Sequence, residues 1–254
     1  MRISDIKPEV YSMAERAMAR VKPQFEKIDA VAEANTRRVM EAFQDNRVSD
    51  SCFAGTTGYG YDDLGRDTLD KIYAQIFGTE AALVRIGFVN GTHALTAAMF
   101  ALAKPGDVIL AATGMPYDTL RSAIGIEGEC HGSLKFYGID YRQVDMTASG
   151  APDYDGIAAA AADSRVAAVM IQRSRGYAER KALTIDEIRE ICAVVRRVNP
   201  TAHIMVDNCY GEFTDVLEPT HVGADIIAGS LIKNPGGGIA PTGGYVAGKK
   251  ALVE

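Results

Sequence analysis

The sequence contains few cysteines and histidines, and neither residue type occurs at the spacing of a metal site. The four cysteines are scattered without a CxxC pair, and the four histidines form no HExxH motif. These absences argue against a disulfide framework and against a zinc site. We therefore expect no metal in the functional site.

Long apolar runs and an excess of positive charge are also missing. No run approaches the ~20 apolar residues that a membrane-spanning helix needs, and the first ten residues, MRISDIKPEV, lack the apolar core of a signal peptide. A net charge of -6 gives no general attraction to nucleic acid or anionic lipid. We expect a cytoplasmic protein that binds neither nucleic acid nor membrane.

The sequence does contain a regular alternation of short apolar runs and helical stretches from residue 81 onward. The apolar runs cover residues 82–86, 107–112, 134–139, 166–171, 203–207, 225–230 and 243–248, and the helical stretches cover 92–102, 117–123, 154–162 and 185–198. This pattern predicts an α/β fold with a mostly parallel, seven-stranded sheet covered by helices on both faces. The last run follows a loop rather than a helix, so it is the one candidate for an antiparallel strand.

Residues 7–46 have the spacing of apolar side chains that is typical of a helix. We expect Pro23 to begin a second helix there, because its missing N–H costs nothing in a first turn. A loop rich in Gly and Tyr follows at 55–61, and then a helix at 67–77. The predicted organisation is an N-terminal helical arm, residues 1–50, and one large α/β domain, residues 51–254.

Two charged residues close successive predicted strands. Asp207 ends the run HIMVD, and Lys233 follows the run DIIAGS. Ligands of open parallel sheets lie beyond the carboxyl ends of the strands. A lysine that forms a Schiff base and an aspartate that faces a pyridine nitrogen are the pair that a pyridoxal phosphate (PLP) site requires. The neighbours of Lys233 in sequence are apolar, and we expect desolvation to lower its pKa. The alternatives are a strand-end aspartate in a turn and an exposed loop lysine.

A third candidate is the segment Asn90-Gly-Thr-His-Ala94, which opens a predicted helix. Backbone N–H groups and a threonine hydroxyl at a helix start suit a phosphate, although the segment taken alone favours a plain N-cap role for Thr92. Ser230 is a further hydroxyl for the same phosphate. Tyr117 and His93 are the candidates for stacking on a cofactor ring.

These residues lie in segments that resemble the methionine gamma-lyase-like, or aluminium-resistance, family of Cys/Met-metabolism PLP enzymes of fold type I. The resemblance is carried by GSLIKNPGGGIAPTGGYVAG (229–248), DNCYGEF (207–213), MPYDTL (115–120), GTHAL (91–95) and GYGYDDLGRDTLD (58–70). It covers essentially the whole chain, and it implies the fold of a PLP-dependent transferase-like large domain.

The resemblance also implies a role for each site residue. Lys233 would carry the cofactor and act as the catalytic base, and Asp207 would hold the pyridine nitrogen. Gly91, Thr92 and Ser230 would bind the phosphate, and Tyr117 would stack on the ring and assist catalysis. Tyr61, with Tyr59 as the alternative, would reach the site of a neighbouring subunit.

Two features depart from the family pattern. Asp63 stands where an arginine usually follows the loop tyrosine, with Arg66 as a substitute. Members of the group also continue into a small C-terminal domain that carries an arginine for the substrate carboxylate, and we expect this chain to lack that domain. The implied assembly is a homodimer or homotetramer with a site shared between subunits, clasped by the helical arm.

The predicted function is a PLP-dependent carbon–sulfur lyase that acts on a sulfur-containing amino acid. The alternative is a PLP-binding protein with little catalysis, involved in cofactor handling or in metal or stress resistance. A nucleotide-binding domain is disfavoured, because no GxGxxG follows the first strand and no GxxxxGK[ST] occurs.

Overall fold

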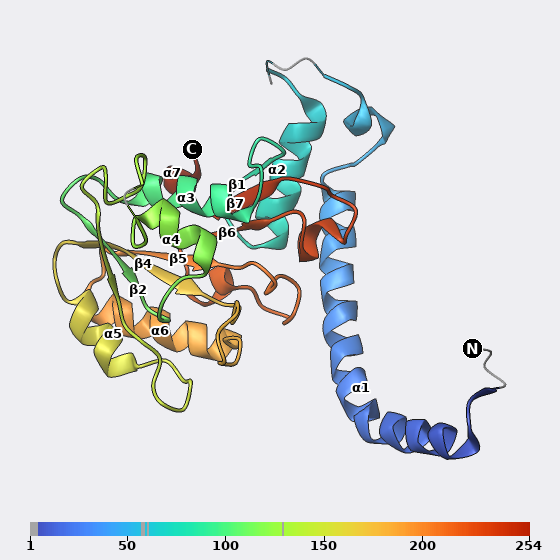
Figure 1. Cartoon of the computed structure of the whole chain (residues 1–254). Coiled ribbons are helices and arrows are strands. Elements are labelled where there is room, and N and C mark those ends of the chain that lie inside the picture. The colour runs from blue at the N-terminus through green and yellow to red at the C-terminus, as the bar shows by residue number, and fades with distance from the viewer. Residues whose placement is uncertain (1–4, 57–58, 60, 129) are drawn as a thin grey trace.

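The computed structural model describes residues 5–56, 59, 61–128 and 130–254. Within these residues a seven-stranded sheet has the order β1-β7-β6-β5-β4-β2-β3 (Figure 1). The strands are β1 (Ala81–Arg85), β2 (Val108–Ala111), β3 (Asp140–Gln143), β4 (Val166–Gln172), β5 (His203–Asp207), β6 (Ile226–Ser230) and β7 (Gly244–Gly248). All neighbouring pairs are parallel except those of β7, which is antiparallel to β1 and β6. The mostly parallel sheet and its antiparallel last strand are confirmed.

Helices cover both faces of this sheet. The side chains of a strand point alternately to the two faces, so each face contributes to its own core. Val108 and Leu110 of β2 face the core that contains side chains of α5 (Tyr154–Ala161) and α6 (Ile185–Val198). Ile109 and Ala111 face the opposite core, which contains side chains of α3 (Gly91–Leu102), α4 (Asp118–Ile124) and α7 (Lys250–Val253). Helix α2 (Leu64–Ile76) packs beside β1. Short 3-10 helices within the described ranges are η2 (Asp50–Phe53), η3 (Pro219–Val222) and η4 (Asn234–Gly236).

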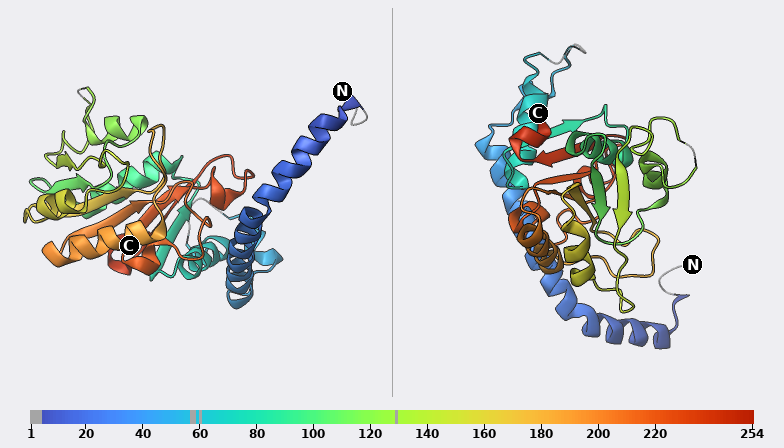
Figure 2. Two further views of the ribbon diagram at one scale, coloured as in Figure 1. Left: turned by 90° about the horizontal axis from the view of Figure 1, so that it is seen from below. Right: turned by 90° about the vertical axis from the view of Figure 1, so that its left-hand side faces the viewer.

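The N-terminal arm is one long helix, α1 (Pro8–Asp45), whose N-terminal part projects away from the sheet (Figure 2). The prediction that Pro23 begins a second helix is wrong, because α1 continues through it. The helix is bent (Figure 1), and a proline inside a helix removes a backbone donor and commonly causes such a bend. Its C-terminal half is attached to the domain through Asn35, whose side chain donates to the carbonyls of Phe213 at 3.1 Å and Asp215 at 3.0 Å.

The predicted strand 134–139 is also wrong. Those residues form turns, and the strand beside β2 is β3 at 140–143. Leu134 and Ile139 are buried, which explains the apolar pattern, but Gly138 has a φ of +76° and reverses the chain before the strand begins. None of the helices in the described ranges combines the length and the apolar character that crossing a bilayer requires.

Candidate functional site

A cavity of about 810 Å³ opens beyond the carboxyl ends of β5 and β6, beside the start of α3. This is where a ligand is expected in an open α/β sheet. Most of the predicted site residues line it, namely Gly91, Thr92, His93, Tyr117, Asp207, Ser230 and Lys233. The structure therefore brings together residues from four separate regions of the sequence.

Lys233 follows β6 and is half-buried at the edge of the cavity, with its Nζ 4.4 Å from the centre of the Tyr210 ring. Burial lowers the pKa of Lys233, but the neighbouring Cys209 and Asp207 outweigh that effect and raise the pKa above its usual value. The expected downward shift is therefore wrong. The prediction was based on the apolar residues next to Lys233 in the sequence. In the fold, the groups that raise its pKa are Asp207 at the end of β5 and Cys209 just after that strand.

Asp207 is the last residue of β5 and is 1% exposed. Its Oδ1 accepts the N–H of Cys209 at 3.0 Å. Burial raises the pKa of Asp207, and the hydrogen bonds from Cys209 and the charge of Lys233 oppose the rise. A buried carboxylate of this kind is stabilised by a cationic group placed against it.

The first turn of α3 faces the same cavity. The residue that caps the helix is Asn90, whose side chain accepts the N–H of His93 at 3.0 Å, so Thr92 has no capping role. The Thr92 hydroxyl instead lies 3.0 Å from both Tyr117 Oη and Thr119 Oγ1. The helix start thus presents backbone N–H groups and hydroxyls to the cavity.

Gly91 allows a close approach of α3 to the strand ends. A methyl group at Gly91 would lie 3.0 Å from Cys209 Sγ and 3.2 Å from Ser230 Cβ. Ser230 is fully buried, and its Oγ accepts the N–H of Ile232 at 3.3 Å. The absence of a side chain at Gly91 therefore keeps the helix start beside a buried serine hydroxyl.

The two candidates for ring stacking differ in how they are held. Tyr117 precedes α4, and its backbone N–H donates to Gln172 Oε1 at 3.2 Å. Burial, reinforced by the charge of Asp207, raises the pKa of Tyr117, so its hydroxyl keeps its proton. His93 accepts the N–H of Val89 at 3.3 Å through Nδ1 and meets the Phe88 ring edge-on. His93 is thus fixed to the wall of the cavity by local contacts.

The loop tyrosines do not reach the cavity of their own chain. Tyr59 and Tyr61 are 84% and 86% exposed and are not among the residues that line it. Thr57, Gly58 and Gly60 of the same loop lie outside the described residues. Asp63 caps α2 by accepting the N–H of Arg66 at 3.0 Å, and the Arg66 side chain lies 3.3 Å from Asp63. Arg66 lines a neighbouring cavity of about 860 Å³ instead.

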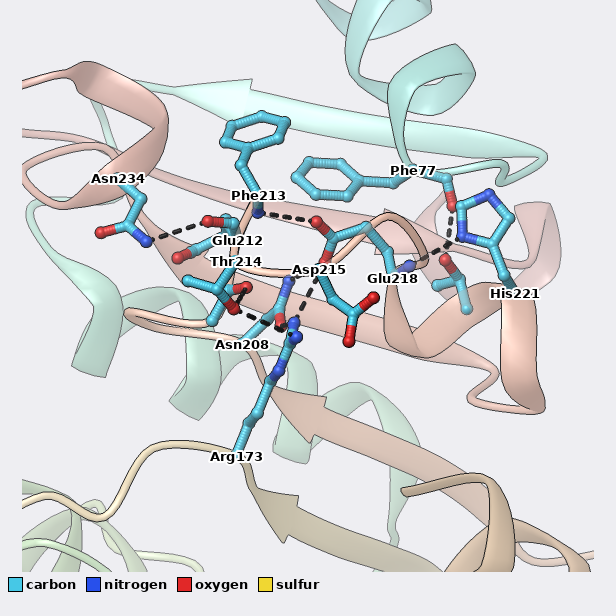
Figure 3. A network of polar contacts seen from close by, with 12 residues as sticks. Phe77, Arg173, Asn208, Glu212, Phe213, Thr214, Asp215, Glu218, His221 and Asn234 are labelled. Atoms are coloured by element: carbon cyan, nitrogen blue, oxygen red, sulfur yellow. Dashed lines mark hydrogen bonds and ion pairs between the residues drawn. The ribbon is translucent and has the colours of Figure 1, made fainter. Parts of the chain in front are cut away.

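Several residues near the site were missed by sequence analysis. Cys209 and Tyr210 follow Asp207 directly, and the signal for them was their place in DNCYGEF. A buried polar cluster contains Arg173, Asn208, Glu212 and Glu218 (Figure 3). Two glutamates soon after a buried strand look like surface residues in sequence, because only the tertiary fold shows that they are enclosed.

These residues fit PLP. Lys233 supplies an amine and Asp207 a buried carboxylate, and both line one cavity. Because Gly91 has no side chain, the start of α3 lies close to Ser230. The N–H groups of the helix start and the Ser230 hydroxyl together suit a phosphate. Within the described part of the chain, no group of His, Cys, Asp and Glu side chains is arranged to hold a metal ion.

The fold and the cavity define the class of protein as one with the type I fold of PLP-dependent enzymes. The pyridoxal-5'-phosphate-dependent protein YhfS of Escherichia coli has this fold, with a TM-score of 0.65 at 17% identity over 88% of this chain and 56% of that one. Residues 10–254 match the methionine gamma-lyase family. The chain belongs to that family.

Two relatives indicate how far the similarity extends. The chain is 51% identical over 228 residues to the protein YnbB of Bacillus subtilis, which covers 89% of this chain and 54% of YnbB. It is 49% identical to a carbon–sulfur lyase involved in aluminium resistance from Clostridium novyi, with a TM-score of 0.92 over 98% of this chain and 59% of that one. The chain thus spans about half the length of the curated relative and about 60% of the solved one.

Proposed function

We propose that this chain binds PLP through Lys233 and forms the cofactor-holding part of a carbon–sulfur lyase that acts on a sulfur-containing amino acid. The observation that supports this is the convergence of Lys233, Asp207 and the first turn of α3 on one cavity. The names of relatives, including L-methionine gamma-lyase of Pseudomonas putida at 27% identity over 80% of this chain, support the reaction class.

Each residue would have its own part in holding the cofactor. Lys233 would bind it through Nζ, Asp207 would hold its ring nitrogen, and Gly91, Thr92 and Ser230 would hold its phosphate. Tyr117 would pack its ring against the cofactor, and His93 would form part of the adjacent wall. When bound, PLP supplies an electron sink that stabilises negative charge on the carbon beside the amino group of the substrate.

The protein residues then move protons. The free Lys233 amine would take the proton from the substrate α-carbon. Asp207 would hold a proton at the ring nitrogen. Tyr117 Oη, whose pKa is raised by burial, or Lys233 Nζ gives a proton to the departing sulfur. General acid–base assistance of this kind is typically worth about 10²–10⁴-fold in rate.

The proposed assembly is a homodimer or homotetramer in which Tyr61, or Tyr59, completes the site of a neighbouring subunit. Both tyrosines are almost fully exposed on the single chain. The projecting part of α1 also exposes apolar side chains, including Met13, Met18, Phe25 and Ile28. An exposed apolar stripe on a long helix is suited to contact with another subunit.

A second candidate function is PLP binding with little catalysis, in cofactor handling or in metal or stress resistance. The observation that favours it is that the Clostridium novyi relative is named for involvement in aluminium resistance. The two functions differ in whether a keto acid and a thiol are released from a sulfur-containing amino acid.

The test of the proposal is the visible and near-ultraviolet absorbance of the protein with PLP, beside a Lys233→Ala variant. We expect a Schiff-base band that borohydride removes and that the variant lacks. An assay of keto acid release from a panel of sulfur-containing amino acids then separates a lyase from a binding protein. The same band in Lys233→Ala would contradict the assignment of Lys233.

A further inference from the structure

Glu212 is a fully buried carboxyl group for which the proposed reaction has no role. It lies in the segment after β5 and is 0% exposed. Its Oε1 accepts the hydroxyl of Tyr245 from β7 at 2.9 Å, while its Oε2 has no hydrogen-bond partner among the described residues. Burial of an incompletely bonded carboxyl group is unfavourable, so its retention calls for a reason.

The Glu212 side chain packs against the start of the segment that carries Lys233. A methyl group at Gly229 would lie 2.6 Å from Glu212 Oε1 and 2.7 Å from Tyr245 Oη. Gly229 immediately precedes Ser230 at the end of β6. The pair formed by Glu212 and Tyr245 therefore occupies the space beside β6 and restricts the position of the strand end.

The Glu212 main chain holds the other end of the same segment. The Asn234 side chain, from the residue after Lys233, donates to the Glu212 carbonyl oxygen at 2.9 Å (Figure 3). Glu212 thus contacts residues 229 and 234, which flank Ser230 and Lys233. One residue fixes both ends of a six-residue segment that carries two of the proposed cofactor contacts.

Glu212 can act in this way because its own segment is rigidly attached. Glu218 Oε2 accepts hydrogen bonds from Asn208 Nδ2 at 3.0 Å and Arg173 Nη1 at 3.3 Å, and Glu218 Oε1 accepts one from the N–H of Phe213 at 2.8 Å (Figure 3). Glu218 is 0% exposed. Buried hydrogen bonds of this kind hold the segment after β5 in one arrangement.

We propose that Glu212 is a positioning residue that holds segment 229–234 from both ends and thereby sets Lys233 Nζ for the cofactor. The link to the cofactor rests on the proposed function, whereas the hold on the segment does not. Glu212 acts through Lys233 and does not touch the cavity.

The groups around Glu212 favour its neutral form. Burial, with the charges of Glu218 and Asp207, raises the pKa of Glu212 to about 8, and the hydroxyl of Tyr245 opposes this. Glutamine has nearly the same shape and no charge, so Glu212→Gln is the conservative variant. Glu212→Ala releases the side-chain contact, and Asn234→Ala releases the main-chain contact.

The experiment measures two properties of the full chain: hydrogen exchange of the backbone amides in residues 229–236, and the PLP concentration that half-saturates the absorbance band. We expect Glu212→Ala and Asn234→Ala each to speed exchange in this segment and to raise the half-saturating concentration, both by about tenfold, as for loss of one hydrogen bond. We expect Glu212→Gln to stay within about twofold of the unaltered protein.

A matched control is Ile188→Ala in α6, which also truncates a fully buried side chain but lies away from the cavity. It should lower the melting temperature and leave both readouts of the segment unchanged. Unchanged exchange in Glu212→Ala, or equal effects of Ile188→Ala, would overturn the proposal. If the unaltered protein shows no PLP band, the proposed function fails, and the exchange data still decide whether Glu212 holds the segment.

Discussion

Asp207 is buried where a carboxylate is costly, and such a group is more often kept for function than for stability. We predict that Asp207→Asn lowers lyase activity at least about 100-fold, because the electrostatic partner of the cofactor ring is lost. The melting temperature should stay the same or rise, because burial raises the pKa of Asp207 and a neutral side chain avoids that cost. Steady-state rates and thermal melts check both parts. Full activity in the variant would contradict the proposed role of Asp207 toward the cofactor ring.

Glu212 gives the stability of the chain a dependence on pH. Its pKa is about 8 in the folded chain and near the usual 4.5 when unfolded. Between these values the folded state holds a proton that the unfolded state has released, so stability falls as the pH rises across this window. We predict that Glu212→Gln, which cannot ionise, loses less stability than the unaltered protein between about pH 5 and about pH 9.

Denaturant unfolding at both pH values measures this difference. The control is Glu33→Gln on α1, where the glutamate side chain is 73% exposed and should not affect the pH dependence. Parallel pH curves for the unaltered protein and Glu212→Gln would show that Glu212 is ionised in the folded chain at all these pH values.

The site residues that sequence could predict are those at the ends of regular elements. Lys233 and Asp207 follow neighbouring apolar strands, and Gly91 opens a helix, so the pattern of elements places them together. Glu212 and Arg173 could not be predicted, because their burial depends on contacts between segments far apart in the chain. The predicted direction of the Lys233 pKa shift was wrong for the same reason, because Cys209 and Asp207 approach Lys233 only in the folded chain.

At the scale of the element, helix α3 joins cofactor binding to local stability. We predict that Asn90→Ala lowers the free energy of unfolding by about 1 kcal/mol, the usual effect of losing an N-cap, and also raises the PLP concentration for half-saturation. Thr184→Ala is the matched control, because Thr184 caps α6 by accepting the Glu187 N–H at 3.2 Å, away from the cavity. It should lower stability by a similar amount without affecting PLP binding. Equal effects of both variants on PLP binding would show that α3 has no special role.

The prediction of elements worked where apolar runs are long and failed where they are not. Strands β4, β5 and β6 are almost continuously buried, and their runs were unambiguous. Strand β3 is a polar strand, Asp140–Gln143, at the edge of the described sheet, where it pairs with β2. Its sequence has little strand character, and the preceding run 134–139 is apolar because Leu134 and Ile139 pack into the core from turns. A polar segment such as β3 can form a strand because it lies at the edge of the sheet, and that position depends on the tertiary fold.

At the scale of the whole molecule, the single chain leaves apolar side chains on the projecting part of α1 and the rings of Tyr59 and Tyr61 exposed. A long helix with exposed Phe25 and Ile28 and a loop with exposed Tyr61 are consistent with one interface. If that interface places Tyr61 in the site of a neighbour, an active site needs Lys233 of one subunit and Tyr61 of another. Neither residue alone then defines the site.

This leads to a prediction for mixed assemblies. A dimer made from one Lys233→Ala chain and one Tyr61→Phe chain contains one site with both substitutions and one site with neither. Random pairing of equal amounts would therefore restore about a quarter of the sites, although each variant alone is impaired. Coexpression of the two variants and assay of lyase activity measures this recovery. If Tyr59 is the residue that crosses, Tyr59→Phe will show the recovery instead, because complementation identifies the side chain that the partner supplies.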